Sequence, residues 1–246
     1  MNKMVYLLLL ISFLMMCHAQ RDDNIKPYSE NEAYWHYKGK SVLLLGASNN
    51  DNLFQSGDVE QQLDELVAAG GNYIRNTMSS RDSGDVWAFH KLPDGKYDLD
   101  RWNDEYWEKF STLLKLAAAR DVIVQIEVWD RFDYSREPWQ QNPFNPQNNV
   151  NYTVDECGMN VEYPDHPYKD LQPFFHTIEN MPRYEPKLEL VKKYQEKFVD
   201  KILFYSLQHG NVLYCMNNET NTPLEWGQYW LSYIRDKADQ QNKEVY

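Results

Sequence analysis

A regular alternation of apolar strand-length runs with amphipathic helices constrains the fold of this chain more than any other sequence feature. Four apolar runs are predicted strands, at residues 41–48, 73–78, 122–129 and 212–219. Each is followed by a predicted helix, at residues 58–69, 103–120, 186–208 and 224–238. Strict strand-then-helix order with apolar strands indicates an α/β fold with a parallel sheet covered by helices.

Loop chemistry and loop length favour a (β/α)8 TIM barrel over a doubly wound sheet. The first strand-to-helix turn, which begins at Gly46, lacks the further glycines of a dinucleotide-binding loop. Connections after strands are long, at 79–102 and 130–185, whereas connections after helices are short. Barrel enzymes elaborate this same C-terminal face of the strands. We therefore expect the strands in sequential order with all helices on one side.

Residues 41–246 are accordingly expected to form a partial (β/α)8 barrel catalytic domain, truncated after about four βα units. Residues 243–246 resemble the opening of a fifth strand, and half a barrel leaves open sheet edges, which isolated proteins avoid. The sequence therefore predicts a fragment of a longer protein.

Residues 130–185 are rich in proline, asparagine and aromatic side chains. A disordered insertion is one interpretation, but the aromatic density favours an ordered lid or cleft wall. Aromatic residues make up 15% of the chain, which fits either a large aromatic core or stacking on flat ligands. Those in this segment are Trp139, Phe144, Tyr152, Tyr163, Tyr168, Phe174 and Phe175.

The first nineteen residues have the organisation of a secretory signal peptide. Lys3 precedes an apolar run at 4–16, and Cys17, His18 and Ala19 follow where a signal peptidase cuts. The run is short for a membrane span, although an uncleaved anchor is one alternative and a lipid on Cys17 another. We expect a secreted, periplasmic or cell-surface protein in which residues 20–40 lead into the barrel.

Charge and cysteine content narrow the partners. The formal net charge of −12 repels nucleic acid and anionic membranes, so we exclude both as partners. Cys157 and Cys215 either form a disulfide or remain idle thiols. The six histidines are scattered, and no spacing suggests a metal site or a bound cofactor.

The most specific chemical signal is Asn218-Glu219 at the end of the fourth predicted strand. A carboxyl at that point projects into the mouth of a barrel, where it can protonate a glycosidic oxygen, and Asn218 can hydrogen-bond a sugar hydroxyl. Retaining hydrolysis needs a second carboxylate about 5–5.5 Å away. The alternative is a solvated glutamate stabilised by a helix N-terminus.

The chain resembles the clan of retaining (β/α)8-barrel glycoside hydrolases that includes cellulase-like and apiosidase-like families. The resemblance rests on the opening at 37–46, on Arg75 in the second strand, and on residues 211–214 leading into Asn218-Glu219. It implies that Glu219 is the acid/base, that Asn218 contacts the 2-hydroxyl and that Arg75 steadies the nucleophile. The nucleophile of that clan ends strand seven, which lies beyond this N-terminal half.

Other residues at strand ends are weaker candidates for sugar contacts. Trp129 is predicted to stack on a sugar ring and Asp130 to accept sugar hydroxyls, with core packing and capping as alternatives. Glu127 shares strand parity with Trp129, so it is a candidate for the barrel interior. Residues predicted to line the cleft floor or wall are Ser48, Asn49 and Asn76.

The sequence supports two functions. The first is a secreted glycoside hydrolase acting on polysaccharide or oligosaccharide by retaining double displacement, and the second is a non-catalytic carbohydrate-binding protein or degenerate barrel. For the enzyme we expect Arg75, Trp129 and Glu219 to gather at the C-terminal ends of the strands, under residues 130–185. The sugar and the linkage do not follow from the sequence.

Overall fold

The computed structural model describes residues 23–219 and 221–246. The predicted signal peptide and Cys17 lie outside the described residues. Within them, no helix combines the length and the apolar character that crossing a bilayer requires.

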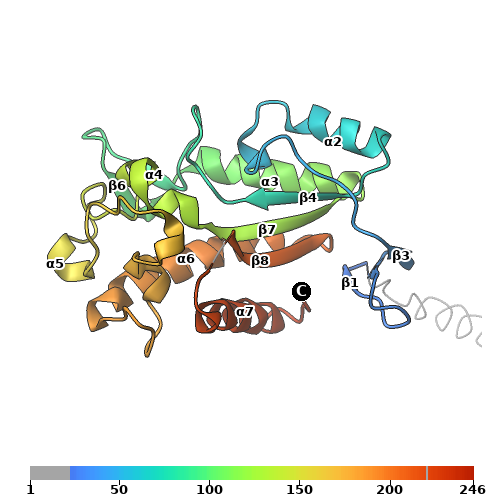
Figure 1. Ribbon diagram of the computed structural model, residues 1–246. Helices are drawn as coiled ribbons and strands as arrows, with labels where there is room; N and C mark the ends of the chain where they lie inside the picture. Colours follow the sequence, from blue (N-terminus) through green and yellow to red (C-terminus); the bar gives the residue numbers. More distant parts are fainter. Residues whose placement is uncertain (1–22, 220) are drawn as a thin grey trace, which may run out of the picture.

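Three parallel strands form the central sheet (Figure 1). They are β4 (Tyr73–Thr77), β7 (Ile123–Asp130) and β8 (Val212–Asn218), in the order β4-β7-β8. Tyr73 pairs with Ile123, and Glu127 pairs with Cys215. Predicted strands two, three and four are therefore confirmed, with sequential order and parallel direction.

The prediction of a first parallel strand at 41–48 is wrong. Its start belongs to an antiparallel sheet of β1 (Lys26–Pro27), β2 (Trp35–Tyr37) and β3 (Lys40–Val42). Residues 43–48 then run beside β4 without forming a strand ladder. The Asn72 side chain takes the place of a backbone partner, since its Oδ1 accepts from Leu45 N at 2.9 Å and its Nδ2 donates to Leu43 O at 3.0 Å.

Gly46 allows this segment to lie against β4. A Cβ at this position would sit 2.1 Å from the Tyr73 carbonyl oxygen and 3.0 Å from Leu66 Cδ1. Because the nearest atom is backbone, Gly46→Ala should displace residues 43–48 and lower the free energy of unfolding by about 1–3 kcal/mol. Urea denaturation measures this. Gly57→Ala is the matched control, because a Cβ there meets no atom within 4 Å, and equal effects in both variants would contradict the packing argument.

Four long helices follow the strands close to the predicted limits. They are α2 (Val59–Ala68), α3 (Asp104–Ala119), α6 (Glu189–Ser206) and α7 (Leu224–Asp239). Each has an apolar stripe, and α3 begins at Asn103, whose side chain accepts from Glu105 N at 3.2 Å. Figure 1 shows the helices around one side of the sheet, as expected, which leaves the opposite face open.

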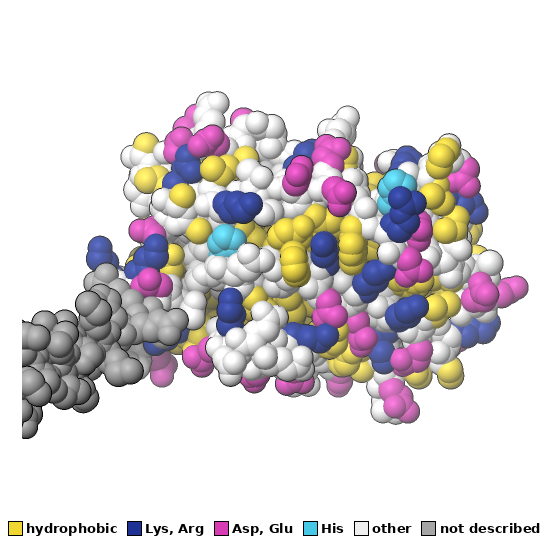
Figure 2. Space-filling view, turned by 180° about the vertical axis from the view of Figure 1, so that it is seen from behind, with side chains coloured by type: hydrophobic (Ala, Val, Ile, Leu, Met, Phe, Trp, Pro, Cys, Tyr) yellow, Lys and Arg dark blue, Asp and Glu magenta, His cyan; other side chains and the backbone are white. Residues whose placement is uncertain are grey.

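The helix-covered side is shown in Figure 2, where basic and acidic side chains are interspersed around hydrophobic ones. Lys201 of α6 lies 4.9 Å from the ring centroid of Phe204, 5.1 Å from that of Tyr205 and 5.8 Å from that of Trp102. Cation–π contacts of this kind let half-exposed rings remain at the surface.

The connection at 79–102 contains a hairpin that the sequence analysis did not identify. Strands β5 (Phe89–Lys91) and β6 (Tyr97–Trp102) are antiparallel, and Leu92 N donates to Lys96 O at 2.7 Å across the turn. The turn sequence Pro93-Asp94-Gly95 was the available signal, with Gly95 at φ +89°.

The segment at 130–185 is ordered, as predicted, and residues 131–188 contain short helices joined by loops. These are η2 (Arg131–Tyr134), α4 (Arg136–Gln141), α5 (Val154–Cys157), η3 (Pro167–Lys169), η4 (Pro173–His176) and η5 (Pro186–Leu188). Most of their aromatic side chains are buried, with Tyr134 and Phe174 stacked at 4.1 Å between ring centroids. Of the seven aromatic residues predicted in this segment, Tyr168 is exposed, at 61%, and the other six are buried. The aromatic density therefore reflects a core rather than a stacking surface.

Candidate active site

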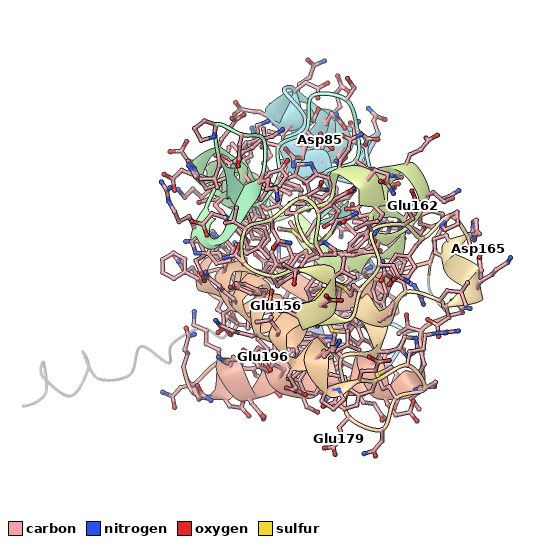
Figure 3. All side chains as sticks on the ribbon, turned by 90° about the vertical axis from the view of Figure 1, so that its left-hand side faces the viewer. Asp85, Glu156, Glu162, Asp165, Glu179 and Glu196 are labelled. Carbon is pink, nitrogen blue, oxygen red and sulfur yellow. The ribbon has the colours of Figure 1, made fainter. Side chains whose placement is uncertain are left out.

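The site lies where β7 and β8 end, and Figure 3 views the molecule from the side toward which these strands run. Asp130 closes β7 and Asn218 closes β8, and the two residues pair in the parallel register. Asn218 Nδ2 donates to Asp130 Oδ2 at 3.3 Å, and both side chains are buried. Two predicted substrate contacts are thus neighbours, with Asp130 also accepting from Phe132 N at 3.0 Å.

Glu219 follows directly and is exposed. Its φ of +43° is in the left-handed region, so the chain turns sharply out of the strand at this residue. Non-glycine residues in this region cost free energy and are held by their surroundings. This turn places an accessible carboxylate at the C-terminal end of β8.

Arg131 secures the segment that follows Glu219. This guanidinium is 1% exposed and donates to Asn221 Oδ1 at 3.2 Å and to Thr222 Oγ1 at 2.8 Å. Its Nη2 also pairs with Asp170 Oδ1 at 2.7 Å, and its Cζ lies 4.5 Å from the ring centroid of Phe175. Residues 131–188 therefore hold the loop after β8 in place.

A network of charges continues from Asp130 to the open face of the sheet. Arg81 contacts Asp130, and its Nη1 lies 3.2 Å from Asp133 Oδ1. Asp51 joins Arg81 to Arg75, at 3.5 Å and 3.4 Å respectively. Arg81, Asp51 and Asp133 were not predicted from the sequence. The available signal was Asp133, an acidic residue three positions after Asp130.

Arg75 completes the network at the open face. Its Nε lies 3.4 Å from Glu127 Oε1, and its side chain is 42% exposed while that of Glu127 is 4% exposed. The other carboxylate oxygen of Glu127, Oε2, has no hydrogen-bond partner among the described residues. Burial raises the pKa of Glu127, although the charge of Arg75 opposes this. An arginine and a buried carboxylate thus face the space that a closed barrel would enclose.

Asp133 is the most perturbed carboxyl of the site. Burial, and then the negative charge of Asp130, raise its pKa to about 7, against the opposing effects of Arg81 and of a hydrogen bond from Ser79 Oγ at 2.8 Å. The pKa of Arg81 is raised too, because Asp130 and Asp133 together outweigh its own burial. Asp133 therefore changes its protonation state near neutral pH, beside the cation of Arg81.

The remaining predicted residues are not gathered at this point. Trp129 is fully buried, with its ring 5.3 Å from that of Phe198 and 5.5 Å from that of Trp230 between centroids, so neither face is available to a sugar. Asn76 is buried and accepts from Phe54 N at 2.9 Å, which fixes η1 (Leu53–Gln55).

The first-strand candidates lie beside α2 and β4. Asn49 is exposed and its backbone N donates to Gln62 Oε1 at 3.3 Å. Ser48 Oγ donates to Asn50 O at 2.7 Å and lies 3.3 Å from Arg75 O. Ser48 thus supports the backbone of the strand that carries Arg75.

The structure also describes the cysteines and the possible metal ligands that the sequence analysis considered. Cys157 and Cys215 are both free thiols. Among the described residues, no group of three or more histidine, cysteine, aspartate or glutamate side chains is arranged to hold a metal ion.

Comparison with solved structures finds this fold in glycoside hydrolases. A family 5 mannosidase from Rhizomucor miehei has a TM-score of 0.56 and 16% identity, over 90% of this chain and 55% of that one. An endo-1,4-beta-mannanase from the same organism has a TM-score of 0.52 and 16% identity, over 86% and 57%. A Bacteroides vulgatus protein described as a glycoside hydrolase has a TM-score of 0.55 and 12% identity, over 89% and 37%.

No family model matches the sequence, and no curated protein matches it. The structural likeness, at such low identity, is a likeness of fold: an α/β arrangement of the kind found in TIM-barrel glycoside hydrolases. The chain spans between 37% and 57% of the length of the three proteins named above.

Proposed function

We propose that this chain belongs to a glycoside hydrolase that acts on polysaccharide or oligosaccharide outside the cytoplasm by retaining double displacement. One observation carries the proposal: an exposed glutamate follows the buried Asn218–Asp130 pair, at the C-terminal end of a central strand in a fold found in glycosidases. This is the end at which barrel enzymes carry out their chemistry.

In this mechanism Glu219 is the acid/base. Its carboxyl gives a proton to the oxygen of the leaving sugar while a second carboxylate attacks the anomeric carbon and forms a glycosyl-enzyme. Glu219 then removes a proton from the incoming water, which displaces the enzyme carboxylate and restores both groups. Asn218 contacts the sugar, Asp130 orients Asn218, and Arg75 steadies the nucleophile.

The nucleophile is proposed to come from a seventh barrel strand outside the 246 residues, and the protein is proposed to be exported by its N-terminal signal, with Cys17 as a candidate lipid site. The second candidate function is a non-catalytic carbohydrate-binding protein. The observation in its favour is that the parallel sheet of the described residues has three strands. Reading the gene past codon 246 separates the two, because the enzyme needs a glutamate at the end of a seventh strand.

Hydrolysis assays test this proposal. The 246-residue chain should release no reducing sugar from mannan or cellulose, because one carboxylate cannot complete double displacement. A longer gene product that contains the seventh strand should release it, and Glu219→Ala should abolish the release. Robust hydrolysis by the 246-residue chain, dependent on Glu219, would contradict the placement of the nucleophile outside these residues.

A further inference from the structure

A groove of about 570 Å³ lies beside the β5–β6 hairpin, and its lining residues are distant in sequence from Glu219. One wall is the segment that leads into β5, the floor includes Tyr97 of β6, and the other wall is the end of α4. Its volume lies within the range of small-ligand sites, about 300–1,000 Å³. The residues that line it include Asp85, Trp87, Lys91, Tyr97 and Gln141. Asp85 is labelled in Figure 3.

Side chains from η1 and from the start of α3 hold the first wall rigidly. Gln55 Nε2 donates to Val86 O at 2.9 Å, and Asn103 Nδ2 donates to Trp87 O at 2.9 Å. The carbonyl oxygen of Ala88 accepts from Trp107 Nε1 at 3.0 Å. Three consecutive carbonyl groups are thus fixed by side chains from other elements.

The second wall is fixed in the same way. Asn148 Nδ2 donates to Gln140 O at 2.8 Å at the end of α4, and Tyr97 N donates to Asn148 O at 2.7 Å. Because β6 also pairs with β5, which follows the first wall, the two walls are joined through the hairpin. A ligand that enters such a groove loses little affinity to ordering of the protein.

The exposed chemistry of the groove suits a neutral polyhydroxyl ligand. Trp87 is half-buried: one part of its indole packs on the hydrophobic core, and the rest borders the groove. Gln141 is exposed on the opposite rim, while Asp85 and Lys91 supply one acidic and one basic group of opposing charge. An indole face binds the apolar face of a hexose, and amide and charged groups bind its hydroxyls.

We propose that this groove is an additional binding site for a neutral oligosaccharide, with Trp87 stacking on a sugar ring and Gln141 and Lys91 hydrogen-bonding its hydroxyls. The inference rests on the proposed function and deepens it, because the groove lies at the same end of the sheet as Glu219. It holds a substrate chain at a distance from the reacting bond.

Nuclear magnetic resonance tests the proposal with cellohexaose and mannohexaose, each titrated into the ¹⁵N-labelled protein. At least one of them should shift the indole N–H signal of Trp87 and the side-chain amide of Gln141. Trp87→Ala should weaken binding at least about tenfold, as loss of a central aromatic contact does. Gln141→Ala should weaken it less. Phe204→Ala, which removes a 60% exposed ring on α6, is the matched control and should bind normally.

Thermal unfolding of each variant checks that it folds. If Trp87→Ala does not fold, sugar binding by the separate variants Gln141→Ala and Trp87→Phe decides the question. Shifts confined to the surroundings of Asn218 would overturn the groove site and leave the proposed function standing. Shifts at Trp87 with a proline-rich peptide and with neither sugar would overturn it too. Sugar binding at Trp87 in a longer protein that hydrolyses nothing would support the groove site and contradict the proposed enzyme.

Discussion

Glu219→Gln, in a longer protein that supplies the second carboxylate, should slow hydrolysis of natural polysaccharide by about 10²–10⁴-fold. Glutamine keeps the shape of the side chain but has no transferable proton. Substrates with activated aryl leaving groups need little protonation, so the first step should slow far less for them. Steady-state rates on mannan and on an aryl glycoside measure the difference.

Azide makes this test specific to acid/base catalysis. In the variant, the glycosyl-enzyme accumulates because no base activates water, and azide attacks without a base, so its addition should restore turnover of the aryl substrate. Glu225→Gln, an exposed glutamate in the first turn of α7, is the matched control and should leave both rates unchanged. Equal slowing of both substrates without azide rescue would mean that Glu219 acts only through stability.

Arg81→Met should give the largest loss of stability among substitutions at the site. Methionine keeps the apolar stem but leaves Asp130 and Asp133 buried, with side chains 0% and 5% exposed, and without their shared cation. Breaking a buried ion pair from one side typically costs about 3–5 kcal/mol. Urea denaturation at pH 8 should show a loss of this order, whereas Arg120→Met, which breaks pairs with exposed partners, should cost below about 1 kcal/mol.

The effect should depend on pH. Asp133 has a pKa of about 7 in the folded protein, above the unfolded value of about 4. Its contribution to stability is therefore fully present below about pH 4 and is lost as the pH rises through about 7. Without Arg81 the pKa of Asp133 rises further, so the variant should lose less at pH 5 than at pH 8. Adding Asp133→Asn should recover much of the loss, and an equal loss at both pH values would contradict the argument.

Sequence periodicity predicted those strands and helices that carry a regular apolar pattern. The second, third and fourth strands and all four long helices follow from apolar spacing, whereas the contact between Asn218 and Asp130 is known only from the structure. The first strand failed because an apolar run does not reveal that the Asn72 side chain takes the place of its backbone partner. Leu43 and Leu45 are 49% and 54% exposed, the opposite of what their apolar character suggests.

Parity along β7 was the weakest basis for prediction. Glu127 and Trp129 are two residues apart and were expected on the same face, yet Glu127 contacts Arg75 while Trp129 packs against Phe198 and Trp230 of the helices. Alternation of faces does not persist where a strand ends. Arg81 and Asp133 were not predicted, because they lie in two different connections and only the tertiary structure brings them together.

Residues 131–188 cannot be exchanged as a unit. Long connections on barrel enzymes commonly vary between relatives because they sit on a scaffold that folds without them. Here Phe174 lies 5.4 Å from Trp129 between ring centroids, so the connection and β7 share one aromatic core. Grafting another connection would remove part of that core. Single exposed residues of this segment, such as Tyr168 and Gln141, should therefore tolerate replacement, whereas a change in the length of the segment should not be tolerated.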